Sequence, residues 1–364
     1  MNSGLRCCDH LACLRSVSRI VGALHRVKKA GNCRERRQRF RHAALLRRAK
    51  ADDLAYPFSM RYVLGFDGGG TKTECVLMGQ DHRILAQTRS GPSNPMRVGF
   101  GGALASVCEA ARTAILSAGI AGEEVTSLCA GLAGTAYSES AQKMKRLIEE
   151  EFPGKTVRVC TDLDLTLEGT GEGAAIVLIA GTGSAAIGRD AQGNVARVGG
   201  HGYLLGDDGS AYHVGQRAIR GALRYFERTG ADTPLGKRIL AEMGESSWTE
   251  LQPRINAGPD EVFPHVFPVV LQAAEANDPA ARALLDDSAT ALADLVKDLA
   301  ERMQLQSRRF LLARTGGMLG RSQYFDERLD NFLRKAAPFG QFGALQLSPA
   351  EAAAHLALRL RPSP

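Results

Sequence analysis

Two glycine-threonine turns, each placed between two apolar, β-prone runs, constrain the fold of this chain most strongly. The first glycine turn covers residues 67–73, between Tyr62–Phe66 and Glu74–Met78. The second glycine turn covers residues 180–184, and similar runs of five and four residues lie on either side of it. Short apolar runs joined by glycine-rich turns are typical of strands. The sequence therefore predicts two β-hairpins, each with a glycine-rich tip, and a second turn at residues 79–82 predicts a third strand after the first hairpin.

Such turns are suited to binding phosphate. Glycine has no Cβ, so the backbone can adopt positive φ and present several N–H groups to an anion, and a threonine hydroxyl adds a donor. A single turn of this kind is equally consistent with a tight turn that binds nothing, but two facing turns can hold one polyphosphate. The residues predicted to bind it are Gly68, Gly69, Gly70, Thr71 and Lys72 in the first turn and Thr182, Gly183 and Ser184 in the second.

Two other phosphate-binding motifs can be compared directly with the sequence. A Walker loop requires Gly-Lys-Ser/Thr, but Thr71 separates Gly70 from Lys72. Residues 181–186 fit the dinucleotide pattern G-x-G-x-x-A, with Asp207 near the distance expected of a ribose-binding carboxylate. That pattern must open a helix, but the glycines within residues 187–202 would interrupt a helix there. A hairpin is the favoured interpretation.

Four blocks of this sequence closely resemble the N-acetylglucosamine kinase and BadF/BadG-type ATPase family. They are GFDGGGTKT from Gly65, TDLDL from Thr161, IAGTGS from Ile179 and GGHGYLLGDDGSAY from Gly199. The resemblance runs from Arg61 to about Leu360. It implies an α/β fold of two ribonuclease H-like, actin-like ATPase domains with a nucleotide cleft between them. We expect the domains at 60–172 and 173–345, with a terminal helix at 346–360 that joins the first domain.

The pattern of the residues agrees with an α/β chain. Apolar residues at helical spacing predict helices at 101–118 and 138–152, with strands at 127–130 and 156–160. Residues 210–303 are predicted to be mainly helical, and Asp278-Pro279 is a helix start signal. A late strand at 310–313 and a helix at 349–358 complete the prediction, in which the second half repeats the plan of the first.

The basic character of the chain is confined to its beginning. Residues 1–60 carry 14 Lys+Arg against 4 Asp+Glu, a net of +10, and the rest carries 32 against 35, a net of −3. We expect residues 1–59 to be a largely disordered leader, and we expect no nucleic-acid binding by the folded domains. Neither a secretory signal nor a run of eighteen apolar residues is present, so no membrane span is expected.

The cysteines indicate a reducing compartment. Cys7, Cys8, Cys13 and Cys33 lie in the leader, and Cys75, Cys108, Cys129 and Cys160 are isolated in apolar stretches. The latter four are predicted to be buried free thiols, which favours a cytoplasmic location.

Phosphoryl transfer needs phosphate donors, a divalent metal and a carboxylate that accepts the hydroxyl proton. The resemblance implies that Asp67 holds Mg²⁺ and that Asp162 is the catalytic base. Asp162 follows a predicted strand, where side chains of an α/β sheet face the crevice. The alternative role of Asp162 is that of a helix N-cap. Asp164 is the nearest competitor as base, and we expect it to point elsewhere.

The resemblance also implies contacts with the other ligand groups. Asn94, Gly200, His201 and Asp207 match positions that bind the sugar, and Gly316 and Gly317 match the loop on the adenosine side. Asn94 is also consistent with a plain turn residue, and the two late glycines with an ordinary turn. His201 departs from the family, because some members carry an indole there that stacks on the substrate.

The function that the resemblance implies is ATP-dependent phosphorylation of N-acetylglucosamine or glucosamine at its primary hydroxyl. The alternatives are a kinase of N-acetylmuramic acid or another hexose, and a regulatory ATPase that acts on a partner protein. ATP, Mg²⁺ and a small-molecule sugar are the expected ligands, and a homodimer is an expected assembly.

Overall fold

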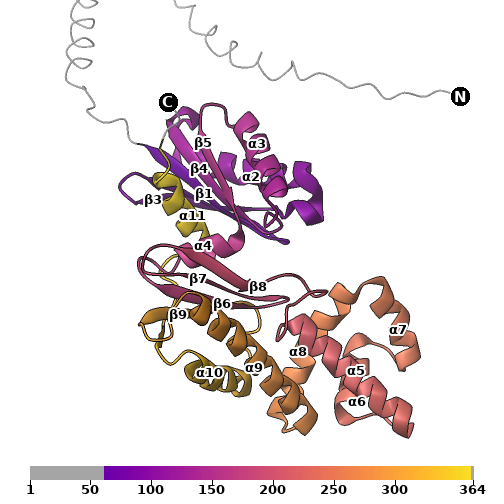
Figure 1. Cartoon of the computed structure of the whole chain (residues 1–364). Coiled ribbons are helices and arrows are strands. Elements are labelled where there is room, and N and C mark those ends of the chain that lie inside the picture. The colour runs from indigo at the N-terminus through magenta and orange to yellow at the C-terminus, as the bar shows by residue number, and fades with distance from the viewer. Residues whose placement is uncertain (1–60, 362–364) are drawn as a thin grey trace, which may run out of the picture. The chain divides into compact units, whose positions relative to one another are not determined.

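A computed structural model of the chain describes residues 61–361. The predicted leader, with its four cysteines, lies outside the described residues. Two five-stranded sheets form the framework of the described part (Figure 1). The first sheet contains β1 (Tyr62–Gly68), β2 (Thr73–Gly79), β3 (Ile84–Ser90), β4 (Val125–Leu132) and β5 (Thr156–Cys160). The second contains β6 (Ala175–Ala180), β7 (Ser184–Arg189), β8 (Val195–Gly199), β9 (Phe310–Thr315) and β10 (Gly340–Phe342).

The two sheets share one topology. The first sheet has the strand order β3-β2-β1-β4-β5. The second sheet, read as β8-β7-β6-β9-β10, has the same order when its strands are numbered from β6 as the first. In each sheet the first hairpin is antiparallel, and the central strand pairs in parallel with the strand that follows a helical crossover. The predicted α/β fold class is thus confirmed, with the internal repeat that it requires. The domain boundaries drawn from the sequence stay predictions.

Helices cover both faces of the first sheet. The helices α2 (Pro95–Ala118) and α3 (Ser138–Glu151) pack on one face, where Leu64 and Phe66 of β1 are fully buried. The helix α11 (Pro349–Leu358) packs on the other face, against Val63 of β1 and Val76 of β2 (Figure 1). Because alternate residues of a strand point to opposite faces, a strand buried on both sides is apolar along its whole length.

The helix α11 lies unusually close to β1. A Cβ added at Gly65 would lie 2.1 Å from the backbone nitrogen of Ala354 and 2.4 Å from the carbonyl oxygen of Ala350. Glycine in the strand and alanine in the helix are therefore both required, because larger residues would separate the two backbones. This contact explains the alanine-rich composition of residues 350–357.

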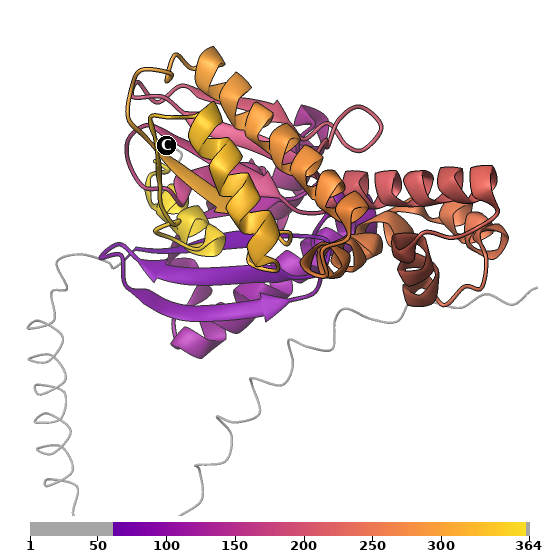
Figure 2. The same cartoon turned by 90° about the horizontal axis from the view of Figure 1, so that it is seen from below.

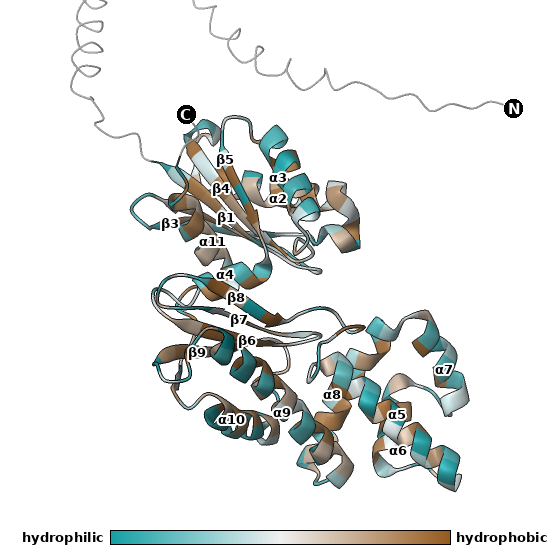
Figure 3. Cartoon of the chain, viewed as in Figure 1, coloured by the Kyte–Doolittle hydropathy of each residue, from teal (hydrophilic) through white to brown (hydrophobic). Residues whose placement is uncertain are grey.

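Helices also dominate the region around the second sheet. They are α5 (Ala211–Thr229), α6 (Pro234–Met243), α7 (Trp248–Ala257), α8 (Pro259–Glu275), α9 (Pro279–Arg302) and α10 (Gln323–Ala336). The helices α9 and α10 run side by side (Figure 2). Ile176 and Leu178 of β6 are buried beneath helices, while Val177 packs on the opposite face with Leu167 of α4 (Asp162–Glu168). The central strands β1 and β6 are largely apolar, whereas the edge strands β3 and β8 and the helices also carry hydrophilic residues (Figure 3).

Most local predictions are confirmed. Both glycine turns join antiparallel strands, so the dinucleotide interpretation of residues 181–186 is wrong. Asp278 caps α9 with Pro279 in its first turn, and Ser348 caps α11. The strands β8 and β10 and the helix α10 were not predicted. The four cysteines of the described residues are buried and free, as expected. None of the described helices is both long and apolar enough to cross a membrane.

Candidate active site

The first glycine turn leaves backbone donors free. Within the hairpin, the Gly69 N–H donates to the Lys72 carbonyl oxygen at 2.9 Å. The Gly69 carbonyl oxygen accepts from the N–H groups of Ser93 and Asn94, at 3.0 and 3.1 Å. Gly69 is therefore committed to the fold rather than available to a ligand. Among residues 61–361, the N–H groups of Gly70, Thr71 and Lys72 have no acceptor.

The second glycine turn has the same property. The Gly181 N–H donates to the Gly183 carbonyl oxygen at 2.9 Å, whereas the N–H groups of Thr182 and Gly183 have no acceptor in the described part of the chain. The Ala211 N–H, at the start of α5, donates to the Gly181 carbonyl oxygen at 2.9 Å. Each turn therefore presents adjacent unpaired N–H groups, which is the arrangement that binds an anion.

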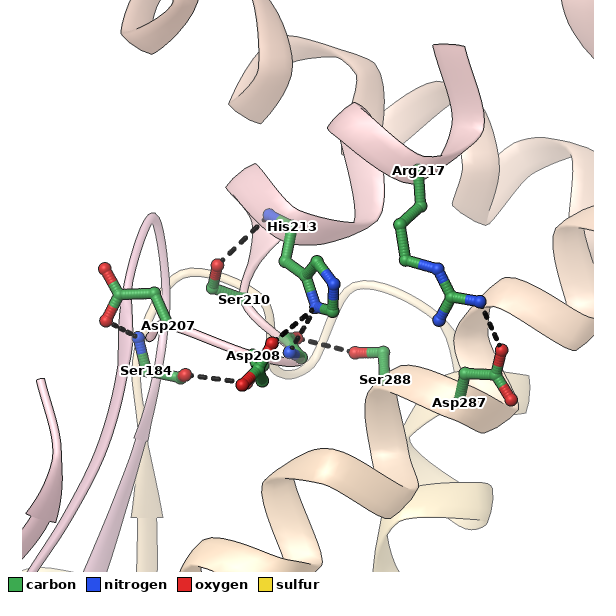
Figure 4. Close-up of polar contacts among 9 residues, drawn as sticks. Ser184, Asp207, Asp208, Ser210, His213, Arg217, Asp287 and Ser288 are labelled. Carbon is green, nitrogen blue, oxygen red and sulfur yellow. Dashed lines mark hydrogen bonds and ion pairs between the residues drawn. The ribbon is translucent and has the colours of Figure 1, made fainter. Parts of the chain in front are cut away.

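A polar network fixes the second turn to the helical region (Figure 4). The Ser184 hydroxyl donates to the Asp208 carbonyl oxygen at 2.7 Å, and the Ser184 N–H donates to Asp207 Oδ1 at 3.2 Å. His213 Nδ1 accepts from the Gly209 N–H at 2.9 Å, and burial lowers the pKa of His213. Because Nδ1 is an acceptor, His213 is neutral here and serves to position the loop before α5.

The late glycines lie beside the second turn. Gly316 has φ of 118°, and a Cβ there would lie 2.1 Å from the Ala180 carbonyl oxygen. The backbone nitrogen of Gly317 is 3.7 Å from the Cβ position of Gly181. Only glycine can occupy position 316, since both its dihedral angle and its close contact with β6 exclude a side chain.

One cavity of about 320 Å³ unites several of the predicted site residues. Its lining includes six of them: Asp162, Thr182, Gly183, Ser184, Gly200 and Asp207. The cavity is thus formed by the start of α4, by the second glycine turn and by the loop after β8. The other predicted residues lie outside its lining; they are Asp67, Gly68, Gly69, Gly70, Thr71, Lys72, Asn94, His201, Gly316 and Gly317.

Asp162 is the first residue of α4, and it is not the N-cap. The cap is Thr161, whose hydroxyl accepts from the Asp164 N–H at 3.2 Å, while Asp164 Oδ2 accepts from the Thr161 N–H at 2.9 Å. This reciprocal capping box holds the Asp164 side chain against the backbone at the start of α4. Asp164 therefore points away from the site, as expected. The capping alternative for Asp162 is therefore wrong, and its carboxylate is left to line the cavity. Burial raises the pKa of Asp162, which makes it a better proton acceptor.

Asp67 lies near Asp162 at the end of β1. Burial, together with the charges of Asp162 and Glu74, raises the pKa of Asp67 from 3.8 to about 6, and Lys72 opposes this shift. Two neighbouring carboxylates in a partly buried position favour a divalent cation, because the cation removes their repulsion. The metal-ligand role that the resemblance implies for Asp67 is compatible with this position and stays a prediction.

The expected sugar residues occupy different surroundings. Asp207 has φ of 61° and lies over the second turn, and burial raises its pKa. His201 is exposed, close enough for its charge to lower the pKa of Asp207. Asn94 Oδ1 accepts from the Met96 N–H at 2.9 Å and caps α2, so its side-chain amide group remains as the donor. This oxygen is also 2.3 Å from the Cβ position of Gly134, which lines the cavity.

Sequence reasoning missed the other lining residues of this cavity, among them Gly134 and Arg197. Gly134 has φ of 85° at the turn before α3, and the pair Ala133-Gly134 was a visible turn signal. Arg197 lies on β8, next to the Cβ position of Gly200. Glycine-rich flanks hid this strand, so no pattern placed Arg197 in the site.

Two α/β repeats of identical topology, each with a glycine turn that presents free N–H groups, define the fold class of actin-like phosphotransferases. The chain belongs to the BadF/BadG/BcrA/BcrD ATPase family, whose pattern matches residues 64–338. The resemblance stated from the sequence is confirmed.

Similar proteins include two curated relatives. An N-acetylmuramic acid/N-acetylglucosamine kinase of Clostridium acetobutylicum is 30% identical over 283 residues, which are 77% of this chain and 92% of that protein. An N-acetyl-D-glucosamine kinase of Dictyostelium discoideum is 27% identical over 82% of this chain and 98% of that protein. A solved structure from Chromobacterium violaceum, described as a candidate N-acetylglucosamine kinase, has a TM-score of 0.67 at 26% identity. It is matched over 83% of this chain and 100% of that one.

The raised pKa of Asp67 gives an expected pH dependence of stability in metal-free protein. The folded chain binds this proton more tightly than the unfolded chain, so the contribution of Asp67 to the unfolding free energy falls as pH rises from about 4 to about 6. The fall is at most about 3 kcal/mol. Asp67→Asn should remove it, which urea unfolding with a chelator at a series of pH values can measure.

Asp190 supplies a control of opposite sign. Its side-chain hydrogen bond from Asn194 lowers its pKa, so its contribution to stability is present above its ordinary pKa and is lost as pH falls. Asp190→Asn should therefore cost stability at neutral pH. If the free energy of unfolding changes with pH in the same way for the wild type and Asp67→Asn, the pKa of Asp67 is not raised in the folded protein and the prediction is wrong.

Proposed function

We propose that this protein is an ATP-dependent kinase of an amino sugar, N-acetylglucosamine or glucosamine, and that it phosphorylates the primary hydroxyl. The observation that supports the proposal is a single cavity whose lining includes both Asp162 and the second glycine turn. A carboxylate next to a phosphate-binding turn is the arrangement that phosphoryl transfer to a hydroxyl requires. The kinases to which the chain is similar are named for substrates of this class.

In this mechanism the two turns hold the polyphosphate. The N–H groups of Gly70, Thr71 and Lys72 bind it from one side, and those of Thr182 and Gly183 bind it from the other. Because these donors are already in place and unpaired, little reorganisation is needed when charge shifts in the transition state. Gly316 and Gly317 lie against the second turn and receive the adenosine side of the nucleotide.

Asp67 would hold Mg²⁺, which neutralises phosphate charge when it is bound. Asp162 accepts the proton of the sugar hydroxyl, and the capping box of Thr161 and Asp164 keeps the start of α4 in place for this step. Gly200 and Asp207 line the same cavity as Asp162, and they bind the sugar together with His201 and the amide of Asn94.

A coupled assay of ADP release across a panel of sugars tests the proposal. The panel contains N-acetylglucosamine, glucosamine, N-acetylmuramic acid and glucose. We expect an amino sugar to raise turnover far above the rate without sugar. If no sugar raises turnover and a partner protein does, the chain is a regulatory ATPase instead. If glucose gives the highest kcat/KM, the substrate class is wrong.

A further inference from the structure

The guanidinium group of Arg97 lies over the first glycine turn. A Cβ added at Gly70 would lie 3.0 Å from Arg97 Nη1 and 3.4 Å from Arg97 Cδ. The side chain is exposed, and within residues 61–361 its guanidinium has no ion pair or hydrogen bond. An uncommitted cation thus lies next to the unpaired N–H groups of Gly70 and Thr71.

Lys72 is in a different situation, although it belongs to the turn itself. Its ammonium group forms an ion pair with the carboxylate of Glu74. It also acts on Asp67, whose pKa it lowers. The charge of Lys72 is therefore already engaged by carboxylates, and a phosphate would have to compete with Glu74 for it.

The carboxylates near this turn also favour a second cation. Asp67 and Glu74 contribute two negative charges and Lys72 one positive charge, so these three groups alone present a net charge of −1 to a polyanion. The guanidinium of Arg97 brings the sum to zero. Like charges at short range disfavour binding of a polyanion. Arg97 thus offsets one carboxylate charge at the turn, in addition to the Mg²⁺ that Asp67 would hold.

The backbone holds Arg97 at the turn. The N–H groups of Ser93 and Asn94 both donate to the Gly69 carbonyl oxygen, and the Asn94 side chain caps the single helical turn that carries Arg97. Gly99, with φ of 72° and ψ of 164°, separates this turn from the rest of α2. The backbone of residues 93–97 is therefore attached to the first glycine turn rather than to the body of the helix. Because this attachment already exists, less conformational entropy of the Arg97 backbone is lost when a ligand binds.

We infer that Arg97, and not Lys72, is the cation that binds the polyphosphate at the first glycine turn. The inference rests on the proposed nucleotide site and adds a binding residue to it. A guanidinium can make two parallel hydrogen bonds to phosphate oxygens, which a single ammonium group cannot match in geometry.

Calorimetric titration with a non-hydrolysable ATP analogue and Mg²⁺ tests this. Arg97→Gln is expected to weaken binding of the analogue by roughly 10- to 100-fold, the usual effect of losing charge-assisted hydrogen bonds. Arg97→Lys should recover part of the loss, and Lys72→Gln should weaken binding less than about threefold. Adenosine, which has no phosphate, should bind Arg97→Gln as it binds the wild type.

Arg112→Gln is the matched control, because Arg112 is an exposed arginine on the same helix that pairs with Glu151 away from the turn. It should bind the analogue like the wild type. If Lys72→Gln loses as much affinity as Arg97→Gln, or more, the inference is overturned. If the wild type itself does not bind the analogue, the proposed nucleotide site and the inferred role of Arg97 are both wrong.

Discussion

Replacing Asp162 with asparagine is expected to lower kcat by roughly 10²- to 10⁴-fold, the usual contribution of a positioned general base. Asparagine keeps the shape of the side chain but cannot accept the hydroxyl proton. The affinities for ATP and sugar should therefore change little. Single-turnover kinetics together with calorimetry of each ligand measure the two effects separately.

Asp164→Asn is the control for this experiment. Asp164 is two residues away and caps α4 together with Thr161, so its replacement should lower stability by about 1 kcal/mol and leave most of the activity. Burial raises the pKa of Asp162, and a general base must be deprotonated to act. As the pH is lowered, kcat/KM of the wild type should therefore begin to fall at a higher pH than it would with an ordinary aspartate. A near-normal rate for Asp162→Asn would exclude Asp162 as the base.

The second large effect concerns the contact between β1 and α11. Gly65→Ala is expected to lower the free energy of unfolding by more than about 3 kcal/mol, at or beyond the upper end of the usual cost of overpacking. The new methyl group would meet the backbone of Ala350 and Ala354 at 2.4 and 2.1 Å, and backbone atoms cannot move aside as a flexible side chain can. Urea unfolding measures the loss.

Gly101→Ala provides the comparison. Gly101 lies in α2, and a Cβ there would meet no atom within 4 Å. Because alanine has the higher helix propensity, this variant should be more stable by up to about 1 kcal/mol. Equal stabilities for Gly65→Ala and Gly101→Ala would mean that α11 does not pack on β1 as described.

The elements that the sequence predicted well carry strong local signals. Apolar runs on both sides of glycine-rich turns gave both hairpins, because strand period and turn chemistry agree there. Asp278-Pro279 and Ser348-Pro349 marked two helix starts, which the structure places at the same residues. Capping is a local interaction, so it can be inferred from neighbouring letters alone.

The parts that escaped prediction either carried an ambiguous local signal or depend on contacts between distant residues. The N-cap of α4 is Thr161 rather than Asp162. The sequence could not distinguish them, because the two residues are adjacent and both residue types can cap a helix. The strand β8 was hidden by glycines at both ends, and with it the position of Arg197 in the cavity. Arg97 lies 27 positions after Gly70, and only the fold brings it over the first turn.

Product analysis tests the central proposal most directly. Purified protein is incubated with ATP, Mg²⁺ and N-acetylglucosamine, the ADP formed is counted, and the sugar product is examined by phosphorus–proton correlation NMR. The proposal predicts one sugar monophosphate for each ADP, with the phosphorus coupled to the two protons of the primary carbon. ADP formed without a phosphorylated sugar, or a phosphate attached at another position, would contradict it.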